Sequence, residues 1–153
     1  MFLFQKADAK GTEQNVLKFF NEDYRSLCAM AGTNLQSPKL SATPTATDSF
    51  NAQENKFIKL IENRKILEAV KRSIKSCSHD SQIILSDRII NGYELYKIMP
   101  KLHISGYGKF YKMQTIACNE FADAFEVQAE PYFENGENNL HAYKKVKNAN
   151  SEK

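Results

Sequence analysis

Hydrophobic positions recur with helical spacing in several parts of the chain, and the first such stretch covers residues 12–32. Apolar and aromatic side chains repeat there every three or four residues, at Val16, Leu17, Phe20, Tyr24, Leu27 and Cys28. Thr12 is expected to cap this helix at its N-terminus, and Gly32 is expected to end it. We expect one N-terminal helix that packs or docks against another surface.

Residues 33–52 show no periodicity. The segment is rich in Ser, Thr, Ala and Pro, which is typical of a flexible linker. At about twenty residues it is too long for a tight connection inside a compact domain. The N-terminal helix is therefore expected to be partly independent of residues 53–125.

A second long helix is predicted over residues 52–77. Leu60, Leu67 and Ile74 lie seven residues apart, a spacing typical of a short coiled coil. Between Lys56 and Lys75 there are seven Lys or Arg and two Glu, a local net charge of +5. A solvated basic face, contact with phosphates and self-association through residues 53–76 all remain open for this helix.

Three further helices are predicted, over residues 80–90, 93–99 and 105–125. Ser78 or Asp80 can cap the first, and Asn91-Gly92 can end it. Pro100 cannot continue the second, and the third follows a tight turn. The order helix, short helix, turn and longer helix is that of a helix-turn-helix. We expect an all-α fold with this motif in residues 53–125 and a disordered polar tail over residues 126–153.

The overall charge is only mildly basic, with a net charge of +3 and a pI of about 8.7, but the positive charge is unevenly distributed. From Arg88 to Gln114 there are five Lys or Arg and one Glu, a net charge of +4. A helix in the major groove reads bases with its first turns and contacts phosphates at its edges. The candidate DNA-contacting residues are Lys97, Lys101, His103, Ser105, Tyr107, Lys109, Tyr111, Lys112 and Thr115.

No motif for catalysis, cofactor binding or metal binding is present in the sequence. The three cysteines, Cys28, Cys77 and Cys118, lack CxxC spacing, and His79, His103 and His141 are isolated. There is no Gly-rich phosphate loop and no nucleophile elbow. Neither a signal peptide nor an apolar run long enough to span a membrane is apparent. We therefore expect a cytoplasmic protein that is not an enzyme and needs no cofactor.

Three stretches resemble the ArpU family of phage-encoded transcriptional regulators, whose relatives include RinA-type late-gene activators. "NVLKFFNEDYRSLCAMAG" (residues 15–32) resembles the family's N-terminal helix, and "NLQSPKLSATPTA" (residues 34–46) resembles the loop that follows. "SQIILSDRIINGYELYKIMPKLHISGYGKFYKMQTIACNEFADAF" (residues 81–125) resembles the C-terminal part. There, Phe110-Tyr111-Lys112-Met113 precedes Glu120-Phe121-Ala122 at the expected distance.

The resemblance implies a helix-turn-helix similar to region 4 of sigma factors, which binds promoter DNA. It also implies control of prophage late genes for packaging and lysis in a bacterial host. Double-stranded DNA is the expected partner, and host RNA polymerase and a second copy of the chain are further candidates. Lys109 stands where an arginine is expected, which favours contact with phosphate over bidentate contact with guanine. A helical protein-interaction adaptor without direct DNA binding is the alternative.

Overall fold

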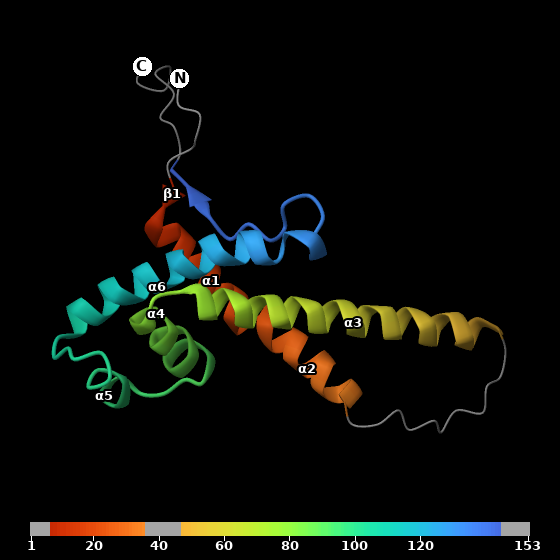
Figure 1. Ribbon diagram of the computed structural model, residues 1–153, viewed down its shortest axis with the longest axis horizontal. Coiled ribbons are helices and arrows are strands. Elements are labelled where there is room, and N and C mark those ends of the chain that lie inside the picture. The colour runs from red at the N-terminus through yellow and green to blue at the C-terminus, as the bar shows by residue number, and fades with distance from the viewer. Residues whose placement is uncertain (1–6, 36–46, 145–153) are drawn as a thin grey trace, which may run out of the picture.

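Helix α6 lies at the centre of a mostly helical structure (Figure 1). The computed structural model describes residues 7–35 and 47–144. Its helices are α1 (Ala9–Asn21), α2 (Asp23–Leu35), α3 (Thr47–Ser76), α4 (His79–Ile83), α5 (Leu95–Ile98) and α6 (Tyr107–Gln128). A π-helical segment follows α4 at Ile84–Ile90, and a 3-10 turn follows α6 at Glu130–Tyr132. The expectation of a small helical protein is confirmed.

The core forms where α1, α3 and α4 pack against α6. Its centre is a group of phenylalanines from α1 and α6, which pack with ring centroids 4.8 Å apart for Phe20 and Phe121 and 5.1 Å apart for Phe19 and Phe125. Val70 from α3 and the neighbouring Ile84 and Leu85 complete it. Aromatic pairs at these distances add stability beyond the area that they bury.

The N-terminal helix predicted over residues 12–32 is two helices, because the chain bends at Glu22. α1 packs mainly against α6, whereas α2 packs against α3, so each half has its own partner. Asp8 is the residue that caps α1, through its side-chain oxygen and the N–H of Gly11, and Gly32 does not end α2. Since α1 supplies part of the core, the expectation of a partly independent N-terminal helix is wrong.

Helix α3 begins earlier than expected, and α2 ends later, so both ends of the predicted linker are helical. The rest of that linker, residues 36–46, lies outside the described residues. The C-terminal half of α3 belongs to the core, while its N-terminal half extends beyond it beside α2 (Figure 1). Leu60 is buried and Ile74 packs on the core, so the seven-residue repeat is used largely within the chain.

The chain after α6 is folded as far as Lys144, which corrects the prediction of a disordered tail over residues 126–153. Strand β2 (Ala142–Tyr143) pairs antiparallel with β1 (Ala7–Asp8), with Ala7 opposite Tyr143. Leu140 packs against the core, and His141 Nε2 lies 3.0 Å from an Asp123 carboxylate oxygen on α6. These contacts offset the ordering cost that a polar segment could not otherwise meet. Residues 145–153 lie outside the described part.

Within the described residues, no helix combines the length and the apolar character needed to cross a lipid bilayer.

Candidate nucleic-acid interface

A defined bend joins α5 to α6. α5 is one turn long; its last residue, Ile98, is buried, as are Met99 and Leu102 just after it. The bend closes with two backbone hydrogen bonds: the N–H of Ile104 donates to Met99 O at 3.2 Å, and the N–H of His103 donates to Pro100 O at 3.2 Å. His103 has a φ of 56°, the left-handed conformation that ends many helices in this pattern. The bend is thus held by backbone bonding and by buried side chains.

The first turns of α6 present an open outer face. Phe110 is fully buried and anchors the start of the helix, while Gly106 occupies the N-cap position. Tyr107 is 62% exposed, and Lys109 and Lys112 are exposed on the same side of the helix. The residues expected to face DNA are therefore accessible rather than packed against protein.

Two further lysines, Lys97 and Lys101, lie near exposed tyrosine rings. Lys97 Nζ lies 5.8 Å from the centre of the Tyr96 ring, and Lys101 Nζ lies 5.9 Å from that of Tyr93. Both rings are exposed, as is Tyr111 on α6. We call residues 93–112 the basic tip. Tyr93 and Tyr96 were not among the predicted contact residues, although both precede Lys97 within a few residues in the sequence.

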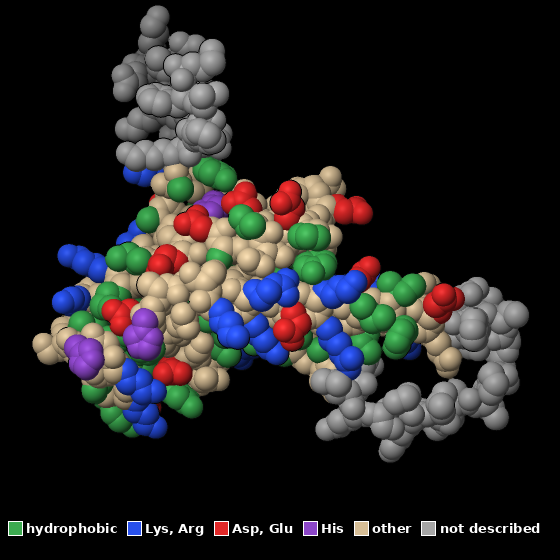
Figure 2. Space-filling view, viewed as in Figure 1, with side chains coloured by type: hydrophobic (Ala, Val, Ile, Leu, Met, Phe, Trp, Pro, Cys, Tyr) green, Lys and Arg blue, Asp and Glu red, His purple; other side chains and the backbone are tan. Residues whose placement is uncertain are grey.

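Positive charge at the basic tip is only partly neutralised. Lys101 forms an ion pair with Asp87 at 2.9 Å. Within the described residues, Lys97, Lys109 and Lys112 pair with no carboxylate. Figure 2 shows Lys and Arg side chains at this end of the molecule and along α3, and Asp and Glu side chains on the side where the chain follows α6. An anionic ligand would thus be drawn towards the basic tip.

Eight of the nine predicted contact residues lie in the basic tip and are exposed (Lys97, Lys101, His103, Ser105, Tyr107, Lys109, Tyr111 and Lys112). Thr115 does not belong with them. Its hydroxyl donates to the carboxylate of Glu13 on α1 at 2.5 Å, and the same hydroxyl accepts from Lys10 Nζ at 3.4 Å. Because Glu13 is buried and also accepts from Gln114, Thr115 is part of the contact between α1 and α6.

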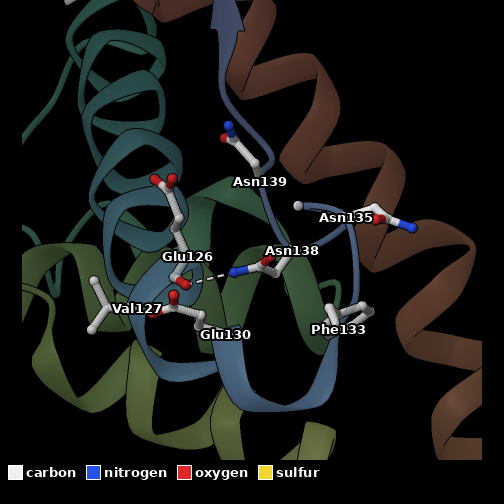
Figure 3. Close-up of a pocket in the computed structure, with 8 residues that line it drawn as sticks. Glu126, Val127, Glu130, Phe133, Asn135, Asn138 and Asn139 are labelled. Carbon is white, nitrogen blue, oxygen red and sulfur yellow. Dashed lines mark hydrogen bonds between the residues drawn. The ribbon is translucent and has the colours of Figure 1, made fainter.

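A cavity of about 570 Å³ lies beside the opposite end of α6 (Figure 3). Asn138 Nδ2 donates there to the backbone oxygen of Glu126 at 2.6 Å. The lining carries two carboxylates and no basic side chain: Glu126, Val127, Glu130, Phe133, Asn135, Gly136, Asn138 and Asn139. Such a lining repels phosphate, so this cavity is not part of the candidate interface.

Two of the three cysteines, Cys77 and Cys118, are buried and unreactive. Burial raises the pKa of Cys77 to about 11 and that of Cys118 to about 12, with smaller contributions from nearby carboxylates. Both thiols therefore stay protonated near neutral pH, and a protonated thiol is a poor nucleophile and metal ligand. No group of three or more His, Cys, Asp or Glu side chains suited to a metal ion occurs in residues 7–35 and 47–144.

The basic tip is thus an exposed, tyrosine-bearing surface with partly unpaired positive charge, supported by a bend in which Leu102 is buried. Its lysines lie on the first turns of a long helix, and its tyrosines lie on both sides of the bend. Comparison of the chain with protein-family models, with curated proteins and with solved structures gives no match.

Proposed function

We propose that this protein is a DNA-binding transcriptional regulator in which α5, the bend and α6 act as a helix-turn-helix. The observation that carries the proposal is the exposed, unpaired pair Lys109 and Lys112 on the first turns of α6. Phe110 and Leu102 are buried on the inner side of the motif and fix the position of these turns. A rigidly held helix with a basic leading end suits the major groove, where the duplex presents both base edges and flanking phosphates.

The remaining residues of the basic tip have supporting roles in this proposal. Lys97 and Lys101 flank α6 and contact phosphates on either side of the groove. The hydroxyls of Tyr107 and Tyr111 donate to phosphate oxygens, and the exposed rings pack against sugars. The acidic residues of α6 lie in its distal half, at Glu120, Asp123 and Glu126, away from the approaching duplex.

The resemblance to ArpU-type regulators adds a biological role to the proposal. The protein would bind promoters of prophage late genes, including those for packaging and lysis, in the cytoplasm of a bacterial host. Host RNA polymerase would then be a second partner. The basic outer face of α3 would add affinity that does not depend on base sequence.

The test is duplex binding measured over a series of salt concentrations, after selection of bound sequences from a random duplex library. Replacing Lys109 and Lys112 together by Ala should weaken binding and lower the slope of log affinity against log salt by about 1 to 2 units, since each lysine at a phosphate releases about one counterion. The matched control is Lys18→Ala with Arg25→Ala, which removes the same charge from exposed sites on α1 and α2.

The control variant should keep the wild-type slope. Equal losses in both variants would mean that binding follows net charge alone and not the basic tip. Negligible duplex affinity of the wild-type protein at physiological salt would overturn the proposal and favour a protein-interaction adaptor.

A further inference from the structure

The N-terminal half of α3 exposes apolar side chains that nothing in the described structure covers. Phe57 is 61% exposed and Ile61 is 37% exposed, and Ile58 beside them is also exposed. Figure 2 shows hydrophobic side chains gathered on the part of α3 that extends beyond the core. Neighbouring large apolar residues exposed together on a helix commonly mark a contact with another protein.

A charged residue lies on each side of the pair Phe57 and Ile61, at equal spacing. Glu54 lies three residues before Phe57, and Arg64 lies three residues after Ile61, so the spacing along the helix is three, four, three. This spacing places all four residues on one face of the helix, and we call them the α3 stripe. The spacing of the α3 stripe is symmetric about the midpoint between Phe57 and Ile61, while its charge changes from acidic at Glu54 to basic at Arg64.

We infer that the α3 stripe is a homodimer contact in which two copies of α3 pair antiparallel. In that register Phe57 packs against the partner's Ile61, and Glu54 pairs with the partner's Arg64. The pair is repeated by the twofold axis, so the contact has two apolar layers and two ion pairs. A parallel arrangement would instead place Glu54 against the partner's Glu54 and Arg64 against the partner's Arg64. The charges therefore select the antiparallel one.

The surroundings of the α3 stripe leave it free to pair. The face of α3 that packs into the core carries Ile66, Ala69, Val70 and Ser73, on the other side of the helix. Leu60 is buried, and Asn63 turns towards α2, where its Nδ2 lies 3.7 Å from Met30 Sδ. Neither Glu54 nor Arg64 forms an ion pair within the described part of the chain. This inference does not rest on the proposed function, since it concerns a contact between copies at a surface away from the basic tip.

The test is sedimentation equilibrium over a range of protein concentrations, in reducing buffer so that the exposed Cys28 cannot cross-link copies. The wild-type protein should dimerise reversibly. Phe57→Ala with Ile61→Ala should abolish the dimer. Glu54→Arg and Arg64→Glu should each weaken it at least about tenfold, because each places like charges opposite one another twice.

Charge exchange provides the control. The double variant Glu54→Arg with Arg64→Glu should recover dimerisation, and an equimolar mixture of the two single variants should form a heterodimer with both ion pairs restored. Circular dichroism would show that every variant is folded. A wild-type protein that stays monomeric at all concentrations overturns the inference. So do single reversals that leave the dimer unchanged, or a double variant that fails to recover it.

Discussion

Two glycines in helices illustrate how much depends on the surroundings of a single residue. A methyl group on Gly11 of α1 would lie 2.7 Å from Cβ of Ala142 in β2, whereas one on Gly108 of α6 would meet nothing within 4 Å. Gly11→Ala should therefore destabilise the fold by about 1 to 2 kcal/mol despite the better helix propensity of Ala. Gly108→Ala should stabilise it by about 0.5 to 1 kcal/mol.

Urea unfolding of the two variants measures both effects under the same conditions. A stabilised Gly11→Ala variant would mean that β2 does not lie against α1 in solution. A destabilised Gly108→Ala variant would mean that the start of α6 is not helical at that position.

The buried thiol of Cys118 predicts a sensitivity to alkaline pH. Its pKa rises from an ordinary 9.0 to about 12 on folding, so the folded state holds the proton more tightly than the unfolded state does. The stability that this proton provides is fully present below about pH 9 and is lost as the pH rises towards 12. Cys118→Ala should lower stability at neutral pH but reduce the fall in stability above pH 9, and Cys77 accounts for part of what remains.

Chemical unfolding at a series of pH values checks this. Ile116→Ala is the matched control, because the Ile116 side chain is exposed on the same helix and carries no titratable group, and it should leave the alkaline fall unchanged. If Cys118→Ala has the same alkaline profile as wild type, burial of that thiol does not set the pH dependence.

At the scale of elements, a carboxylate from one helix caps another. Ser78 or Asp80 was expected to cap the helix that begins near residue 80. Ser78 is the N-cap residue, but its side chain does not cap the helix directly. Glu120 on α6 instead accepts from the N–H of Ser78 at 3.3 Å, from its hydroxyl at 3.0 Å and from the hydroxyl of Ser81. This carboxylate therefore fixes the N-terminus of α4 against α6.

Glu120→Ala should cost about 1 to 3 kcal/mol of unfolding free energy, since it removes a charged acceptor from several donors. Glu120→Gln should cost less, because one acceptor oxygen remains. Glu130→Ala, at an exposed carboxylate after α6, is the control and should stay within about 0.5 kcal/mol of wild type. Unfolding in urea gives all three values, and equal stabilities for Glu120→Ala and Glu130→Ala would contradict the capping role.

The elements that sequence could predict are those with strong local signals. The stripe of Phe110, Phe121 and neighbouring apolar residues predicted α6, and Gly92 takes the positive φ expected after residue 90. The break at Glu22 was not predictable, because it arises from the different partners of α1 and α2. The order of residues 126–144 was missed for a similar reason, since Leu140 and His141 are held by contacts with distant parts of the chain.

For the whole molecule, the candidate site was likewise predictable where the signal is local and not where it depends on distant contacts. Local spacing was enough to place Lys109 and Lys112 on one exposed face, since both lie within one helix. It failed for Thr115, whose position depends on Glu13, about a hundred residues earlier in the chain. Leu60 was a candidate for self-association, but it is buried in the structure, which its spacing in the sequence does not show. The burial of a side chain is decided by elements far away, and a periodic pattern does not report them.

The pairing of β1 with β2, and of α1 with α6, joins the beginning of the described chain to its end. During synthesis Phe19 and Phe20 leave the ribosome long before Phe121 and Phe125, the rings that cover them. The nascent chain must therefore keep these apolar N-terminal side chains exposed, or shielded by a chaperone, until α6 has been made. A message cut short before α6 would yield a polypeptide with no core to complete, and such a product should be cleared by proteases.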